Sequence, residues 1–146
     1  MTMPAVVDIL PHAPPMVLID AITKHSATTA QCEVTIRAGM PFEHDGKVAS
    51  VIAIEFMAQS VAAFAGYQPH IDGEPPEIGY LIGCRKMNFA RSSLSVGEHL
   101  IISVERVFGD VMLGKFTCTV RGADSTLVAD AELTVALPRA GSHNLA

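Results

Sequence analysis

Residues 48–66, VASVIAIEFMAQSVAAFAG, form a long apolar stretch that decides the fold of this chain. About 20 apolar residues are enough for a helix to span a bilayer. Glu55 and Gln59 lie near the middle of the stretch, however, where polar side chains are costly in lipid. A helix that is apolar on nearly every side is typical of the core of a soluble protein. The stretch therefore predicts a buried core helix and no membrane association.

The flanking residues indicate where this helix begins and ends. Ser50 is a suitable N-cap, so the helix is expected to begin there. Gly66 and Pro69 are typical of a helix end, and they place the last residue near Gln68. The preceding loop, residues 38–47 (AGMPFEHDGK), contains glycine, proline and an Asp-Gly pair, all of which favour turns.

Segments in which polar and apolar residues alternate surround the helix. Cys32, Val34 and Ile36 alternate with polar neighbours, which is the period of a strand with one buried face. The predicted strands are residues 16–22, 30–37, 78–89, 100–108, 111–121 and 127–137. Turn-forming residues join the later strands, which indicates antiparallel hairpins. A short helical turn is expected within residues 4–12.

This order of two strands, one apolar helix and four strands predicts an α+β hot-dog fold, in which a curved antiparallel sheet wraps around the helix. The alternative is an ordinary sheet with a helix on one face, but such a helix would carry a polar stripe, and this one has almost none. With 146 residues and no linker, we expect one domain over residues 1–146. Its core spans about 6–137, and residues 138–146 form a flexible tail.

The composition narrows the classes of function. Hydrophobic residues make up 49% and charged residues 17% of the chain, which argues against disorder. A net charge of -5 argues against nucleic-acid binding as the main role. Three widely spaced cysteines indicate neither a disulfide framework nor a zinc site. No Lys or Arg precedes Lys24, so no secretory signal is expected, and the predicted location is the cytoplasm.

Glu55 is the most informative candidate for chemistry. It lies in the second turn of the predicted apolar helix, where burying a carboxylate without partners is expensive. A carboxyl poised between its charged and neutral forms suits a general acid. Gln59 follows four residues later on the same face and could hydrogen-bond it. Alternatively, this face reaches water or a dimer interface and Glu55 has no chemical role.

The start of the helix and two histidines complete the candidate set. Backbone N–H groups of Ser50 and Val51 have no acceptor within the helix and could hold a carbonyl oxygen that gains negative charge, unless this is an ordinary capped terminus. His44 lies in the loop that enters the helix, and His12 lies just before a proline turn. No metal-ligand spacing, P-loop, dinucleotide fingerprint or G-x-S-x-G motif is present.

A basic cluster stands out in an otherwise acidic chain. It consists of Arg85, Lys86 and Arg91. Such a cluster favours an anionic partner. Solvated charges at the end of a strand are an equally good interpretation.

Three motifs lie in order along the chain: residues 10–20 read LPHAPPMVLID, residues 55–59 read EFMAQ, and residues 83–89 read GCRKMNF. They resemble motifs of the beta-hydroxyacyl-acyl carrier protein dehydratases of bacterial fatty acid synthesis, the FabZ type. That family has L-P-H-R-x-P-F-L-L-V-D near its start and E-A-M-A-Q in its core helix, and the third motif loosely resembles its next basic strand. The resemblance spans about residues 6–137.

One segment departs from that family. The family's catalytic histidine lies in G-H-F-P, whereas residues 41–50 here read PFEHDGKVAS. His44 is the only match, and it precedes Glu55 by 11 residues, three fewer than in the family. The family's helix-start glycine falls at Ser50. This altered loop resembles a divergent branch linked to aryl polyene (xanthomonadin-like) pigment biosynthesis.

The resemblance implies dehydration of 3-hydroxyacyl thioesters to trans-2-enoyl thioesters. The substrate would be carried on the 4'-phosphopantetheine of an acyl carrier protein, with no metal or organic cofactor. His44 would be the base, with His12 in reserve, and Glu55 the acid. Amides of Ser50 or Val51 would hold the thioester oxygen.

The resemblance also implies binding roles and an assembly. The substrate-tunnel residues would be Pro11, His12 and Gln59. The residues that bind the acidic carrier protein would be Arg85, Lys86 and Arg91. Because the family pairs His and Glu across a dimer interface, we expect a homo-oligomer, a dimer at minimum, with a tetramer or hexamer as further options. Two rival functions are a hot-dog thioesterase and a catalytically weak subunit of a dehydratase complex.

Overall fold

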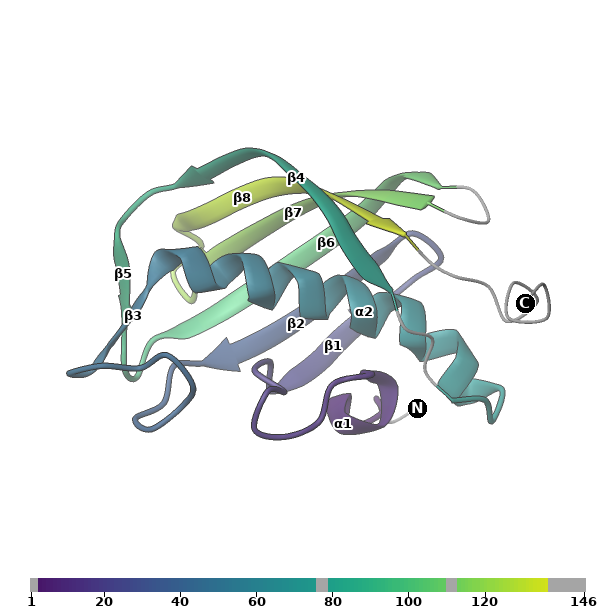
Figure 1. Ribbon diagram of the computed structural model, residues 1–146, viewed down its shortest axis with the longest axis horizontal. Helices are drawn as coiled ribbons and strands as arrows, with labels where there is room; N and C mark the ends of the chain where they lie inside the picture. The colour runs from purple at the N-terminus through teal and green to yellow at the C-terminus, as the bar shows by residue number, and fades with distance from the viewer. Residues whose placement is uncertain (1–2, 76–78, 110–112, 137–146) are drawn as a thin grey trace.

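A six-stranded antiparallel sheet curves around one long helix in the computed structural model of the protein, which describes residues 3–75, 79–109 and 113–136 (Figure 1). The strands, in sheet order, are β1 (Ala21–His25), β2 (Thr29–Thr35), β6 (His99–Gly109), β7 (Leu113–Gly122), β8 (Leu127–Ala136) and β4 (Tyr80–Phe89). The predicted arrangement is thus present. The predicted tail, residues 138–146, lies outside the described residues.

A second, two-stranded sheet was not predicted. It pairs β3 (Lys47–Ala49) with β5 (Ser93–Ser95) in antiparallel register. Three residues are too few for an alternating pattern to be recognised. This small sheet fixes the start of the central helix, because the Ser50 N–H donates to the Ser92 carbonyl at 2.9 Å.

The core lies between the concave face of the sheet and the helix. Strand β2 alternates strictly between half-buried and buried residues, and Cys32 and Val34 are fully buried. Leu100 and Ile102 of β6 are equally buried, and Phe56 of the helix packs in the same core. Burying each such side chain contributes roughly 1.5–3 kcal/mol. The helix is therefore held by the apolar surface that its sequence predicts.

The central helix is longer than predicted and begins differently. A 3-10 turn, η1 (Ser50–Ile52), precedes α2 (Ala53–Ile71). Ser50 is not an N-cap, because its side chain makes no capping bond and Ala49 occupies that position. Pro69 lies inside the helix rather than beyond its end. Pro69 removes only one N–H, and the backbone N–H of Asp72 bonds to the carbonyls of Gln68 and His70 to close the last turn.

By length and composition alone, the segment Ser50–Ile71 would also suit a membrane span. However, 56% of its most apolar window is buried inside the fold. The core helix of a soluble protein passes the same test.

The N-terminal segment packs on the central helix instead of forming the first predicted strand. Helix α1 (Val6–Ile9) lies so close to α2 that a Cβ added at Gly66 would be 2.0 Å from the Ile9 carbonyl oxygen. The strand predicted over residues 16–22 begins only at Ala21. Backbone groups of Met16, Leu18 and Ile19 instead bond to the side chain of Gln59 on α2, which takes the place of a neighbouring strand.

Candidate active site

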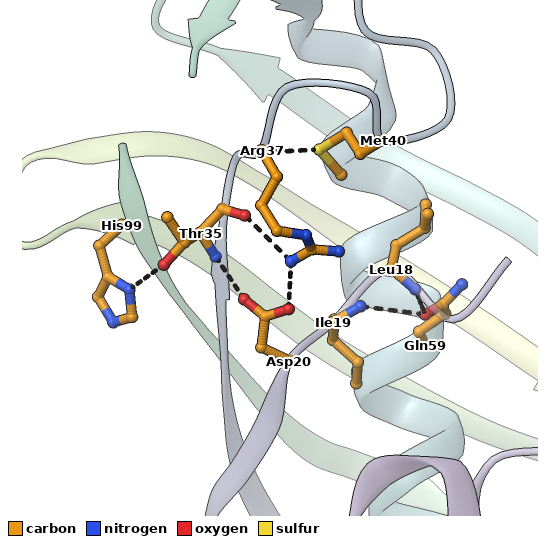
Figure 2. A network of polar contacts seen from close by, with 8 residues as sticks. All are labelled: Leu18, Ile19, Asp20, Thr35, Arg37, Met40, Gln59 and His99. Atoms are coloured by element: carbon orange, nitrogen blue, oxygen red, sulfur yellow. Dashed lines mark hydrogen bonds and ion pairs between the residues drawn. The ribbon is translucent and has the colours of Figure 1, made fainter. Parts of the chain in front are cut away.

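Gln59 joins the N-terminal segment to the candidate catalytic carboxylate. It is fully buried in the middle of α2. Its Oε1 accepts hydrogen bonds from the N–H groups of Leu18 (2.9 Å) and Ile19 (3.4 Å), as Figure 2 shows. Its Nε2 donates to the Met16 carbonyl (2.7 Å) and to Glu55 Oε2 (3.0 Å). The predicted bond between Gln59 and Glu55 is therefore present, and Gln59 is saturated by protein partners.

The His12 ring lies beside the same carboxylate, that of Glu55. Its Nε2 is 3.6 Å from Glu55 Oε2, and the two side chains are 30% and 35% exposed. Glu55 is thus half-buried and partnered, not enclosed in the core as the apolar helix suggested. The two residues are 43 positions apart, and the packing of the N-terminal segment on α2 brings them together. The L-P-H motif was the only sequence signal for this contact.

His12 has an uneven environment around its ring. Nδ1 is buried and has no hydrogen-bond partner among the described residues. An N–H at Nδ1 would therefore be unsatisfied, which costs about 1–3 kcal/mol. The favoured neutral form carries its proton on Nε2, where it points to Glu55.

Glu55 also borders an apolar cavity of about 350 Å³ at the start of the helix. The cavity is lined by Phe42, Val48, Ala49, Val51, Ile52, Ile54 and Glu55. Glu55 is the one charged group among these residues. Gln59 bonds Oε2 of this carboxylate.

Of the two predicted oxyanion amides, only Val51 remains suitable. The Ser50 N–H already donates to Ser92, as described above, whereas the Val51 N–H belongs to the first helical turn, whose amides have no intrahelical acceptor. Val51 also lines the cavity beside Glu55. The Ser50 hydroxyl is buried and has no partner among the described residues.

His44 lies elsewhere within the chain. Its Nε2 is 3.2 Å from Asp45 Oδ2, and both side chains are 89% exposed. The loop that carries it is closed by Glu43, whose carboxylate accepts bonds from the N–H groups of Gly39 and Gly46, each at 2.8 Å. These bonds lower the pKa of Glu43. His44 does not line the cavity beside Glu55, so its predicted role as base stays a prediction.

A second polar network anchors the segment that carries His12. The Asp20 carboxylate accepts a bond from the Thr35 N–H (2.7 Å) and pairs with the Arg37 guanidinium (Figure 2). Asp20 is the last residue of the motif that begins with L-P-H. Its contacts hold this segment against β2, so its role is structural. On the far side of Thr35, His99 bonds the Thr35 hydroxyl and the Glu33 carboxylate.

The predicted basic cluster is partly neutralised. Lys86 lies 3.3 Å from Glu132, and Arg91 forms a bidentate pair with Glu98. Arg85 is exposed and has no carboxylate partner in the described part of the chain. The predicted tunnel residue Pro11 is exposed and precedes His12. Over the described ranges, no group of three or more His, Cys, Asp or Glu side chains is arranged to hold a metal ion.

Comparisons with known proteins identify the family of this chain. A family model described as ApeP-like, ApeP dehydratase, matches residues 4–146. The chain belongs to the ApeP-like dehydratase family. The predicted resemblance to hot-dog dehydratases of the aryl polyene branch is confirmed, and dehydration is the function that the family supports. A search of curated protein sequences found no match.

Solved structures place this ApeP-like chain among hot-dog proteins. It is similar to a chain of the dehydratase heterocomplex ApeI:P from Xenorhabdus doucetiae, with 25% identity, a TM-score of 0.89, and coverage of 99% of this chain and 97% of that one. Smu.793 from Streptococcus mutans, bound to acetyl CoA, has 13% identity, a TM-score of 0.65 and coverage of 88% and 94%. Zebra fish thioesterase superfamily member 2 has 12% identity, a TM-score of 0.65 and coverage of 87% of each chain. The last two show the fold alone, which confirms the predicted hot-dog class.

Proposed function

We propose that this chain is a dehydratase subunit that converts 3-hydroxyacyl thioesters on an acyl carrier protein to trans-2-enoyl thioesters, with Glu55 as the general acid. The observation that carries the proposal is the position of Glu55. It is bonded by Gln59, faced by His12, and borders an apolar cavity at a helix start. The family membership supports the reaction class.

In the proposed reaction, Glu55 acts as general acid. The base removes a proton from C2, the C2–H electron pair forms the C2–C3 double bond, and the C3–O bond breaks. Glu55 delivers its proton to the departing hydroxyl, which leaves as water. The Val51 N–H donates to the thioester oxygen as negative charge develops there. The apolar lining of the cavity suits the acyl chain.

His12 is better placed to position Glu55 than to remove the C2 proton. Taking up a proton at Nε2 would require an N–H at the buried Nδ1 as well, where the described residues provide no acceptor. We therefore assign His12 as a positioning residue whose Nε2 lies 3.6 Å from Glu55 Oε2.

The base in this proposal is His44 of one subunit acting with Glu55 of another. The exposed ring of His44 and its absence from the Glu55 cavity within one chain support this arrangement. So does the resemblance, which implies His and Glu paired across a dimer interface. A second hot-dog subunit then completes the site, and a structure similar to this chain belongs to a heterocomplex of dehydratase subunits. Arg85, which has no carboxylate partner in the described part of the chain, is the strongest contact for the acidic carrier protein.

Mass spectrometry of a 3-hydroxyacyl-acyl carrier protein incubated with the purified protein tests the proposal. The expected result is the loss of one water with the thioester intact. Release of the whole acyl group would instead identify a thioesterase. An unchanged substrate, both for the chain alone and for the chain co-purified with a second hot-dog dehydratase subunit, would contradict a catalytic role.

A further inference from the structure

The start of the central helix is held by the segment that carries β5. The Ser50 N–H donates to the Ser92 carbonyl at 2.9 Å, and the next residue, Val51, carries the N–H proposed to hold the thioester oxygen. Strand β3, which leads directly into η1, pairs with β5 in a two-stranded sheet, where Ala49 lies opposite Ser93. Among the described residues this small sheet is separate from the six-stranded one. The position of the helix start therefore depends on what holds β5.

Arg91 and Glu98 close the segment around β5. Arg91 Nη1 donates to Glu98 Oε1 at 2.9 Å, and Nη2 donates to Oε2 at 2.5 Å. Glu98 Oε1 also accepts a bond from the Ser95 N–H at 2.8 Å. Two parallel bonds from one guanidinium fix the direction of the carboxylate as well as its distance. We call this pair the Arg91–Glu98 clamp.

Both ends of the clamped segment are anchored on the six-stranded sheet. The Glu98 carbonyl accepts a bond from the Ile36 N–H, just after β2, at 2.9 Å. The Ala90 N–H donates to the carbonyl of Val128 on β8, also at 2.9 Å. Between these anchors, Leu94 of β5 is fully buried in the core. The clamp therefore joins two fixed points of the sheet and holds β5 between them.

The clamp is charged at neutral pH and uses up the guanidinium. Burial would raise the pKa of Glu98, but the bonds from Arg91 and the Ser95 N–H outweigh it and lower the pKa from its ordinary value of 4.5. Asp124, on the turn between β7 and β8, acts electrostatically on both members of the pair. Arg91 is thus occupied by carboxylates of its own chain, which leaves it poorly suited to bind an acidic carrier protein.

We infer that Arg91 and Glu98 are positioning residues for dehydration, which hold the Ser92 carbonyl and thereby the helix start that carries the Val51 N–H. This inference rests on the proposed function. Both residues line a groove of about 570 Å³ that includes His99 and Asp124, and neither lines the cavity beside Glu55. They therefore act through the backbone rather than on the substrate. The role in carrier-protein binding predicted for Arg91 is the alternative.

Steady-state kinetics with a 3-hydroxyacyl-acyl carrier protein separates these two roles. Arg91→Gln should lower kcat about two- to tenfold with KM unchanged, because the displaced amide acts mainly in the transition state. Arg91→Lys, which keeps the charge without the fork, should retain part of the lost kcat. Glu98→Gln should also lower kcat, and the double variant should lose no more than the larger single loss, because both substitutions open the same clamp.

Hydrogen exchange reports on the clamp without requiring turnover. The Ser50 amide, bonded to Ser92, should exchange about two- to tenfold faster in Arg91→Gln than in the wild type. Amides of β7 should exchange at the wild-type rate. Arg121→Gln removes an arginine that bonds the Ser125 carbonyl, and this matched control should change neither kcat, KM nor Ser50 exchange.

Two outcomes would overturn the inference. One is an Arg91→Gln variant that raises KM with kcat unchanged, which would make Arg91 a carrier-protein contact. The other is a Ser50 amide that exchanges at the wild-type rate in Arg91→Gln. An inactive wild-type protein whose Ser50 amide exchanges faster after Arg91→Gln would instead support the clamp and overturn the proposed function alone.

Discussion

The two histidine-bearing loops of this protein are held in opposite ways. The loop with His12 is tied to the rest of the fold: Gln59 of α2 bonds its backbone, and its Asp20 carboxylate accepts a bond from Thr35 of strand β2. The loop with His44 is tied mainly to itself, through Glu43 and its two glycine partners. The first loop places a ring on Glu55 within one chain, whereas the second presents a ring to solvent. A histidine presented in this way suits a site shared between two subunits.

The largest expected effect comes from removing the carboxylate that the two histidines would share. Glu55→Gln keeps the size of the side chain and a hydrogen-bond partner for Gln59, but it cannot deliver a proton. General acid catalysis contributes about 10²–10⁴-fold, so kcat for dehydration should fall by this factor with little change in thermal stability. Glu105→Gln, an exposed substitution on β6, is the matched control. Full turnover by Glu55→Gln would remove Glu55 from the mechanism.

Single substitutions of the two histidines rank their roles. His44→Ala should lower kcat by about 10²–10⁴-fold, because it removes the proposed base. His12→Ala should cost about tenfold at most, because it removes only a partly exposed partner 3.6 Å from Glu55, and such a contact contributes about 1 kcal/mol or less. His12→Gln, which restores a donor, should recover part of the lost kcat. His44→Gln should not restore kcat, because glutamine cannot act as a base. The reverse ranking in steady-state kinetics would make His12 the base.

Two substitutions break the attachment of the His12 loop. Gln59→Leu leaves the Leu18 N–H and the Met16 carbonyl without their partner, and each buried unsatisfied group costs about 1–3 kcal/mol. Gly66→Ala places a methyl against the Ile9 carbonyl and should cost about 1–3 kcal/mol through displacement of α1. Chemical denaturation measures both losses. Ala65→Ser, one residue away and half-buried, should have little effect.

Acidification should loosen the His44 loop. Backbone hydrogen bonds lower the pKa of Glu43 from its ordinary value of 4.5. A lowered carboxylate pKa stabilises the closed loop above about pH 4.5, and this contribution is lost as the pH falls through the lowered value. The Gly39 and Gly46 amide signals should shift in this window by NMR. Glu43→Gln should show the loosened loop already at neutral pH; unchanged signals would contradict the role of the carboxylate.

The sequence predicted the parts of the fold that depend on periodicity. Alternation located β2, β6, β7 and β8, and the apolar run located α2. It failed at residues 16–19, because a side chain of α2 competes there for the backbone hydrogen bonds that a strand would use. The prediction that the helix ends near Gln68 was also wrong. Pro69 lies inside the helix, because tertiary packing and the closing bonds at Asp72 outweigh the loss of one helical hydrogen bond.

The candidate site was predicted only in part. Glu55 and Gln59 lie four residues apart, so helix geometry alone predicts their contact. The contact between His12 and Glu55 depends on how α1 packs on α2, which no local pattern encodes. The same is true of the Ser92 carbonyl, which removes the Ser50 amide from the predicted oxyanion pair.

Complementation between inactive variants tests the central claim most directly. His44→Ala and Glu55→Gln, each inactive alone, would be co-expressed with different affinity tags, and the doubly tagged species assayed for loss of water from a 3-hydroxyacyl-acyl carrier protein. Activity should return, because one interface of each mixed dimer contains both an intact His44 and an intact Glu55. The corresponding mixture of His12→Ala and Glu55→Gln should regain at most the dehydration activity of a site that lacks the His12 ring. A His44→Ala and Glu55→Gln mixture that forms dimers but stays inactive would contradict a site shared between subunits.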